Sequence, residues 1–258
     1  MDSLAFYKYQ GTGNDFVMID NREMVFDPEN IALVQRLCDR RFGIGGDGLI
    51  LIQHKEGYDF EMVYFNSDGT KSLCGNGSRC GVRFAEFLGL VKEQTYFLTI
   101  EGGLHAKITP ELIHLKMPNV KGAEQIGADY FINTGSPHYV RFVEDVENLK
   151  VYQEGQAVRY NERFKAEGTN VNFVQRLGKQ DIFVRTYERG VEDETLSCGT
   201  GVTACALASH IEGMPSPVNI KVMGGNLKVS FEQVGPNEFE NIFLIGPAEQ
   251  VFEGTIKL

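Results

Sequence analysis

The sequence predicts a mixed α/β (α+β) fold of two similar lobes, in which each lobe is a curved, mostly antiparallel sheet wrapped on a central helix. Three observations predict it: short runs of Val, Ile, Phe and Tyr between glycines, two helical segments that each begin at Cys-Gly-x-Gly, and an internal repeat. With 258 residues, 42% of them hydrophobic and 23% charged, the chain can bury one large core or two modest ones.

Glycine accounts for 29 residues and mostly separates short runs of β-branched and aromatic residues, which is typical of strands joined by tight turns. The run 59–65 partly alternates between polar and apolar residues, as expected of a strand with one buried face. The strands predicted in this way cover residues 16–20, 49–53, 59–65, 96–101, 112–117, 138–143, 171–176, 181–188, 218–223, 227–231 and 239–245.

Three segments are predicted to be helical: 28–41, 75–90 and 199–211. In 75–90, apolar residues recur at helical spacing from Cys80 onward, so one face should pack on a core. The segment 199–211 is apolar on nearly all sides and should be buried; a glycine and a proline shortly after it end the helix.

An internal repeat relates the two halves of the chain. Landmarks of the first half recur in the same order 122 to 124 residues later: Thr12-Gly13-Asn14 matches Thr134-Gly135-Ser136, Cys74-Gly75-Asn76-Gly77 matches Cys198-Gly199-Thr200-Gly201, and Gly102-Gly103 matches Gly224-Gly225. We therefore expect an N-terminal lobe of residues 1–118, completed by 246–258, and a C-terminal lobe of residues 119–245.

Charge and composition narrow the class of protein. The 25 basic and 35 acidic residues give a net charge of −10, which disfavours a nucleic-acid partner. No run approaches the roughly 18 apolar residues of a membrane helix, and the first residues lack the pattern of a secretory signal, so we expect a cytoplasmic protein with no membrane partner. The glycine-rich run 43–48 precedes a strand, whereas a dinucleotide-binding fingerprint follows one.

The five cysteines show no CxxC spacing, so no metal site is expected. Cys74 and Cys198 occupy matching positions at two helix starts, where unpaired N–H groups and the helix dipole favour a thiolate. If the two lobes pack about an approximate two-fold axis, the two thiols face each other across one cleft and can invert a carbon stereocentre. One thiolate would remove a proton from one face, and the other thiol would return a proton to the opposite face. Cys38, Cys80 and Cys205 are expected to be buried packing residues.

The motifs at these positions resemble those of the diaminopimelate epimerase family, and the resemblance runs nearly end to end. The matching residues are Gly11-Thr12-Gly13-Asn14-Asp15-Phe16, Arg41-Phe42-Gly43-Ile44-Gly45-Gly46-Asp47-Gly48, Tyr64-Phe65-Asn66-Ser67-Asp68-Gly69, Cys74-Gly75-Asn76-Gly77-Ser78-Arg79-Cys80, Gly135-Ser136-Pro137-His138, Asn170-Val171, Tyr187-Glu188-Arg189-Gly190 and Cys198-Gly199-Thr200-Gly201. The resemblance implies the fold of that family and a cofactor-independent epimerase of lysine and peptidoglycan-precursor synthesis. It implies that the enzyme interconverts LL- and meso-2,6-diaminopimelate, with neither cofactor nor metal, as a homodimer.

The resemblance also assigns roles to residues. Cys74 and Cys198 would be the acid/base pair, and His138 and Glu188 would tune their pKa values. The remaining residues would bind substrate: the backbone of Gly75, Asn76, Gly199 and Thr200 would hold the carboxylate at the reacting centre, and Asn14, Asn66, Asn170, Glu188 and Arg189 would hold the amino groups and the distal carboxylate.

Two positions depart from the family pattern: Ser136 stands where many members have asparagine, and Gly48 stands where some have glutamine, so neither is given a substrate contact. Three other functions stay open at this point. They are a proline or hydroxyproline racemase of the same fold, an isomerase like those of phenazine biosynthesis, and a non-catalytic module that binds an amino acid.

Overall fold

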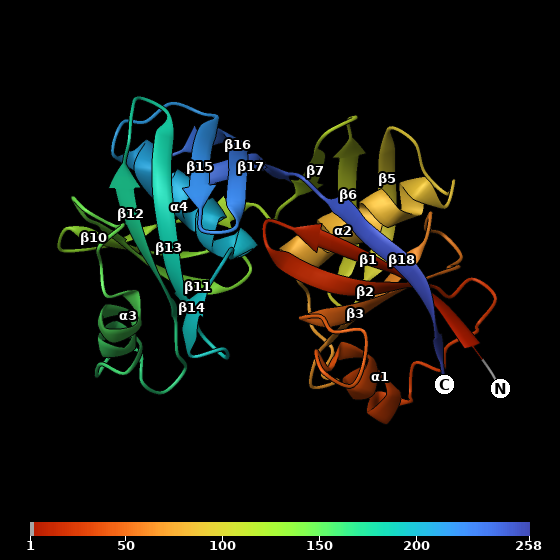
Figure 1. The fold of residues 1–258 in the computed structure, drawn as a ribbon. Helices are drawn as coiled ribbons and strands as arrows, with labels where there is room; N and C mark the ends of the chain where they lie inside the picture. Colours follow the sequence, from red (N-terminus) through yellow and green to blue (C-terminus); the bar gives the residue numbers. More distant parts are fainter. Residues whose placement is uncertain (1–2) are drawn as a thin grey trace. The chain divides into compact units, whose positions relative to one another are not determined.

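The computed structural model describes residues 3–258, which form two compact units, each built around one long helix (Figure 1). The N-terminal unit consists of Met1–Leu115 and Gly246–Leu258, so the end of the chain completes it. The C-terminal unit is Lys116–Ile245. Each unit is described separately below.

In the N-terminal unit, strands follow one another in the order β18-β1-β2-β3-β4-β5-β6-β7. Two of the neighbouring pairs, β2–β3 and β4–β5, are parallel, and the others are antiparallel. The elements are β1 (Ser3–Gly11), β2 (Asn14–Asp20), α1 (Ile31–Cys38), β3 (Gly48–Gln53), β4 (Glu61–Asn66), α2 (Gly75–Phe87), β5 (Gln94–Thr99), β6 (Gly102–Ile108), β7 (Ile113–Lys116) and β18 (Glu249–Lys257).

The C-terminal unit repeats this plan. Its sheet runs β9-β10-β11-β12-β13-β15-β16-β17-β8, with β11–β12 and β13–β15 parallel and β14 added beside β13. The elements are β8 (Val120–Lys121), β9 (Glu124–Ile126), β10 (Asp129–Asn133), β11 (Pro137–Phe142), α3 (Val151–Arg159), β12 (Asn170–Arg176), β13 (Asp181–Glu188), β14 (Asp193–Thr195), α4 (Gly199–Ile211), β15 (Val218–Val222), β16 (Gly225–Gly235) and β17 (Glu238–Gly246).

The register of the strands reproduces the sequence repeat. In the N-terminal unit, Phe16 on β2 pairs with Gly48 on β3. In the C-terminal unit, His138 on β11 pairs with Asn170 on β12, and both residues lie 122 positions further along the chain. The predicted class, a mixed α/β fold of two repeated halves, is therefore confirmed.

Several element bounds differ from those expected. The helix predicted over 28–41 is limited to α1, because the Asn30 side chain caps its start and Asp39 has extended backbone. The strand predicted over 59–65 begins only at Glu61. Helix α3 and strands such as β1 and β18 were not predicted; β18 is exposed at most of its positions, so it carries little hydrophobic alternation.

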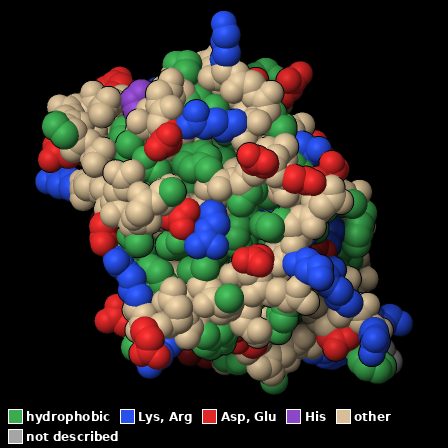
Figure 2. All heavy atoms as spheres, turned by 90° about the vertical axis from the view of Figure 1, so that its left-hand side faces the viewer, with side chains coloured by type: hydrophobic (Ala, Val, Ile, Leu, Met, Phe, Trp, Pro, Cys, Tyr) green, Lys and Arg blue, Asp and Glu red, His purple; other side chains and the backbone are tan. Residues whose placement is uncertain are grey.

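Each unit has its own core. In the N-terminal unit one cluster joins α1 to strands β2 and β3 through Val34, Leu37, Val17 and Leu49. In the C-terminal unit Tyr139, Val158, Phe173 and Tyr187 belong to a cluster between α3 and the sheet. Within the described residues no helix is long and apolar enough to cross a membrane. On the face drawn in Figure 2, side chains of both charges are interspersed.

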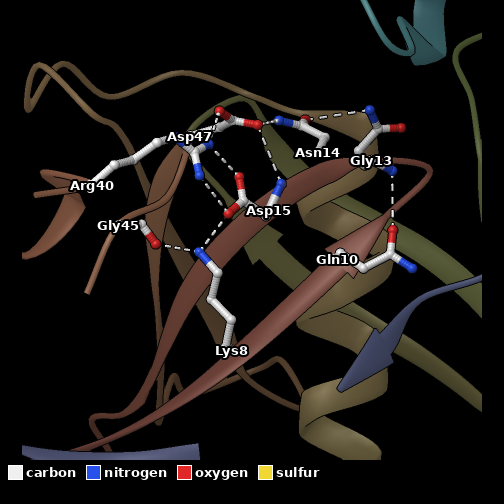
Figure 3. A network of polar contacts seen from close by, with 9 residues as sticks. Lys8, Gln10, Gly13, Asn14, Asp15, Arg40, Gly45 and Asp47 are labelled. Carbon is white, nitrogen blue, oxygen red and sulfur yellow. Dashed lines mark hydrogen bonds and ion pairs between the residues drawn. The ribbon is translucent and has the colours of Figure 1, made fainter. Parts of the chain in front are cut away.

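A network of charges lies beside the first hairpin of the N-terminal unit (Figure 3). The ammonium group of Lys8 is buried; it lies 2.6 Å from the Asp15 carboxylate and also donates to the Gly45 carbonyl. Arg40 binds Asp15 at 2.6 Å and Asp47 at 2.7 Å. Burial alone would raise the pKa of Asp15, but hydrogen bonds from Arg40 and Lys8 and their positive charges outweigh it and lower the pKa to about 2.

This lowered pKa predicts how stability depends on pH. Asp15 takes up a proton at a higher pH in the unfolded chain than in the folded protein. The stabilisation that its folded-state ion pairs provide is therefore nearly complete above about pH 4 and is lost as the pH falls toward 2. The loss should amount to about 2 kcal/mol of unfolding free energy, since one pKa unit corresponds to about 1.4 kcal/mol. Urea denaturation between pH 2 and 5 should show a steeper decline for the wild type than for Asp15→Asn; equal slopes would contradict the assignment.

Candidate active site

A cysteine begins the central helix of each unit. Cys74 is the N-cap of α2, with φ −124° and ψ 119°, and Cys198 is the N-cap of α4, with φ −120° and ψ 109°. The Gly77 N–H donates to Cys74 Sγ at 3.4 Å, and Cys198 is 8% exposed. Both thiols therefore lie at the positive end of a 13-residue helix, as the repeat predicts.

The second glycine of each Cys-Gly-x-Gly allows the helix start to approach the sheet closely. A Cβ on Gly77 would lie 3.3 Å from both Cys74 Cβ and Ile50 Cδ1. A Cβ on Gly201 would lie 2.5 Å from Asn172 Oδ1 and 3.3 Å from Cys198 Sγ. Any larger residue at position 201 would therefore displace the groups around the thiol.

In the N-terminal unit the side chain of Asn14 contacts the thiol of Cys74. Asn14 Oδ1 lies 3.5 Å from Cys74 Sγ and accepts from Asn76 Nδ2 at 3.3 Å. Asn14 Nδ2 donates to Asp47 Oδ2 at 2.5 Å, as Figure 3 shows. Because a carboxylate only accepts, Asp47 fixes which end of the Asn14 amide faces the sulfur. Arg40 in turn holds Asp47.

Asn66 ends β4, where its amide is hydrogen-bonded to three neighbouring side chains. Its Nδ2 donates to Thr70 Oγ1 at 2.9 Å and to Ser72 Oγ at 3.1 Å, and its Oδ1 accepts from Tyr64 at 2.9 Å. Strand pairing places Gly48 opposite Asn66. Phe16, which pairs with Gly48, lies two residues after Asn14, so Asn14 and Asn66 share one edge of the sheet.

In the C-terminal unit His138 lies buried beneath the start of α4. Its Nε2 is 2.9 Å from Thr200 Oγ1, and that hydroxyl oxygen is 3.6 Å from Cys198 Sγ. Burial, and then the positive charge of Arg189, lower the pKa of His138 to about 3. His138 is therefore a neutral imidazole at physiological pH.

Asn170 and the end of β13 form a second group of predicted residues. Asn170 Oδ1 accepts from the Arg189 N–H at 2.9 Å, and its Nδ2 donates to Ser136 Oγ at 2.9 Å. Burial raises the pKa of Glu188, while the hydroxyl of Thr195 donates to its carboxylate at 2.9 Å. This part of the unit thus combines the amide of Asn170, the hydroxyl of Ser136, the partly buried carboxylate of Glu188 and the exposed Arg189.

The comparisons with known proteins cover nearly the whole chain. The family model for diaminopimelate epimerase matches residues 6–117 and 130–251. A curated diaminopimelate epimerase from Flavobacterium psychrophilum is 52% identical over 257 residues, which cover 98% of this chain and all of that protein. One from Aquifex aeolicus is 42% identical, with 98% of each chain covered.

The chain belongs to the diaminopimelate epimerase family. It is therefore an enzyme, an isomerase of the epimerase class that acts on a small molecule.

Solved structures of more distant proteins share the fold of this diaminopimelate epimerase family member. A PhzF-family phenazine biosynthesis protein from Bacillus anthracis matches with a TM-score of 0.76 at 13% identity, covering all of both chains. A hydroxyproline epimerase from Agrobacterium vitis matches with a TM-score of 0.68 at 12% identity, covering 99% of this chain and 93% of that one. At such identities the likeness shows the fold alone.

The structure shows what surrounds Ser136 and Gly48, the two positions that depart from the family pattern. Ser136 accepts a hydrogen bond from Asn170, so its hydroxyl supports a neighbouring amide. A Cβ on Gly48 would lie 2.4 Å from the Phe65 carbonyl oxygen, so this backbone has no room for a side chain at that position.

The other cysteines are buried, as expected. Burial raises the pKa of Cys38 to about 11 and that of Cys80 to about 12, and it raises the pKa of Cys205 well above its ordinary value. Among the described residues no group of three or more His, Cys, Asp and Glu side chains could hold a metal ion.

Sequence reasoning missed Asp47 and Asn172 as parts of these networks. Asp47 had a signal, because it is the one ionisable residue inside the glycine-rich run 43–48. Asn172 had a weaker one: it lies two residues after Asn170 on a strand and therefore on the same face, so the two form a polar pair beside the apolar residues Val171, Phe173 and Val174.

The buried imidazole gives a direct test of this geometry. With a pKa of about 3, His138 should remain neutral from pH 5 to pH 8, so its ring resonances in an NMR titration should not move. The resonances are assigned by their absence from a His138→Gln variant. A titration midpoint between pH 5 and pH 8 would show that the ring is not buried as described.

Proposed function

We propose that this member of the diaminopimelate epimerase family interconverts LL- and meso-2,6-diaminopimelate by a two-base mechanism that uses the thiols of Cys74 and Cys198. The observation that carries the proposal is the matched placement of the two cysteines, each the N-cap of the central helix in one half of a repeated fold. As a family member, the enzyme acts in lysine and peptidoglycan-precursor synthesis.

The proposed reaction conserves every atom of the substrate except the transferred hydrogen. The thiolate of one cysteine takes the proton from the α-carbon, and the electron pair of that C–H bond delocalises into the adjacent carboxylate. The other thiol then donates its proton to the opposite face of the carbon. The enzyme ends with the two sulfur protonation states exchanged, and proton exchange with solvent restores them before the next turnover in the same direction.

The helix starts supply the electrostatic part of this mechanism. The first N–H groups of a helix have no partner inside their own helix, and the dipole adds positive potential there. We assign the N–H groups of Gly75, Asn76, Gly199 and Thr200 to the substrate carboxylate, whose negative charge grows as the proton leaves. Preorganised donors of this kind are usually the largest contribution to catalysis of such a step.

The remaining predicted residues suit the distant end of the substrate. Arg189 carries a planar guanidinium that can bind a carboxylate with two parallel hydrogen bonds. Its backbone N–H is already fixed by Asn170, and Glu188 precedes it with a carboxylate able to bind an ammonium group. We assign Asn14, Asn66, Asn170, Glu188 and Arg189 to the two ammonium groups of the substrate and to its distal carboxylate.

The broader organisation is part of the same proposal. The lobes would be residues 1–118 with 246–258, and 119–245. We further propose a cytoplasmic homodimer that needs neither cofactor nor metal and has no nucleic-acid or membrane partner. The net charge of −10 supports the exclusion of nucleic acid.

Replacement of either thiol tests the mechanism. Cys74→Ala and Cys198→Ala should each lower epimerisation of diaminopimelate by a factor of about 10³ or more, since one positioned proton transfer contributes roughly 10²–10⁴-fold. Turnover is followed by separation of the stereoisomers and by entry of solvent deuterium at the α-carbon. Cys38→Ala, on α1, is the matched control and should keep its activity. A Cys74 or Cys198 variant with near-wild-type turnover would rule out the two-base mechanism.

Alkylation tests the accessibility of the same thiols. Iodoacetamide should inactivate the enzyme by modifying Cys74 or Cys198, and diaminopimelate should slow the loss of activity because bound substrate covers the sulfur. Peptide mapping by mass spectrometry identifies the modified residue. Inactivation with label found on Cys38 alone would contradict the assignment.

A further inference from the structure

The surroundings of Cys198 contain a chain of hydrogen bonds whose directions can be deduced one by one. The chain starts at the carbonyl oxygen of Tyr139, which can only accept. Asn172 Nδ2 donates to it at 2.9 Å, and Asn172 Oδ1 accepts from the Thr186 hydroxyl at 3.0 Å. These two contacts fix the orientation of the buried Asn172 amide.

The fixed amide determines the tautomer of His138. The Nδ2 group of Asn172 lies 3.2 Å from His138 Nδ1 and can only donate, so Nδ1 must accept and carries no proton. Because burial keeps the ring neutral, its single proton resides on Nε2. That N–H donates to Thr200 Oγ1 at 2.9 Å.

The tautomer in turn directs the hydroxyl of Thr200. Its oxygen already accepts from His138, so its own hydrogen is available for the sulfur of Cys198 at 3.6 Å. A hydrogen bond donated to a group that can ionise favours its charged form. The chain therefore delivers a donor to Cys198 and stabilises its thiolate.

The repeat shows that this arrangement is not required by the fold. Gly77 of the N-terminal unit faces Phe16 and Ile50, whereas the matching Gly201 faces Asn172. Phe16 and Ile50 lie 122 residues before His138 and Asn172, and both are fully buried. The same scaffold thus holds an apolar pair behind one cysteine and a chain of hydrogen bonds behind the other. We call this chain, which runs from Asn172 through His138 to Thr200, the relay.

We propose that Asn172 is a positioning residue for catalysis, which fixes the Nε2–H tautomer of His138 so that the Thr200 hydroxyl donates to Cys198 and lowers the pKa of that thiol. The inference rests on the proposed function, because it gives the relay a purpose in proton transfer. It also makes the two thiols unlike, since Cys74 faces the acceptor Oδ1 of Asn14 and the donor N–H of Gly77.

Other ionisable groups near Cys198 do not provide the same donor. Cys205 lies on α4 itself and stays a neutral thiol, because burial raises its pKa. Glu188 on β13 is bonded to Thr195, three residues before Cys198. Arg189, which follows β13, lowers the pKa of His138 and so helps to keep the ring neutral.

The first experiment measures the relay without substrate. Nitrogen-15 shifts of labelled histidine should show His138 protonated at Nε2 in the wild type and should show that preference lost in Asn172→Leu. In parallel, the alkylation rate of Cys198 is followed against pH by peptide mapping. In Asn172→Leu the pH midpoint of Cys198 alkylation should rise by about one unit, which corresponds to a tenfold smaller thiolate fraction at low pH. The midpoint of Cys74 alkylation should not change. Asn226→Leu, on β16 with an exposed side chain, is the matched control and should change neither readout.

A second pair of variants keeps the test decisive if Asn172→Leu does not fold. Thr200→Val should raise the Cys198 midpoint, and Thr200→Ser, which keeps the hydroxyl, should leave it near the wild-type value. Equal midpoints in these two variants, or a wild-type His138 protonated at Nδ1, would overturn the proposal. Neither readout depends on turnover, so failure of the relay is distinct from failure of the epimerase assignment, which the cysteine-to-alanine assays test.

Discussion

In each unit the start of the central helix packs closely against the sheet, and this contact limits which residues can occupy the helix start. Both α2 and α4 have a cysteine as N-cap and a glycine three residues later. A Cβ on Gly77 would contact Ile50 and Cys74 tightly, and a Cβ on Gly201 would clash with Asn172. That closeness places the thiol, the first N–H groups of the helix and the polar ends of the strands within one small volume. Fold and chemistry therefore depend on the same contact.

The two units share one backbone plan but differ in the polarity of the groups behind their cysteines. Strand order, the parallel pairs and even the register of the second and third strands are shared between the units. Behind the thiols the two halves differ: one presents aromatic and aliphatic carbon, the other an imidazole and an amide. In the proposed two-base mechanism the two thiols hold opposite protonation states whenever substrate binds, and the polar groups behind Cys198 would favour the thiolate on that sulfur.

Charged groups in the N-terminal unit connect stability to the candidate site. Lys8 and Arg40 neutralise Asp15, and Arg40 also holds Asp47, whose carboxylate orients the amide of Asn14. A buried ammonium without such partners would cost several kcal/mol. The charged network that surrounds the buried Lys8 therefore extends through Arg40 and Asp47 to the amide beside Cys74.

The repeat, the two central helices, most of the strands and the family are predictable from the sequence, because each leaves a local pattern: a periodicity, a glycine or a motif at fixed spacing. Which side chains meet depends on the three-dimensional fold. Asn14 and Asp47 are 33 residues apart, and His138 lies 34 residues from Asn172 and 62 from Thr200, separations that carry no periodic signal. Strand order and register alone bring such residues together. For the same reason a lysine on the first strand, Lys8, is buried, and β18 pairs with the other end of the chain.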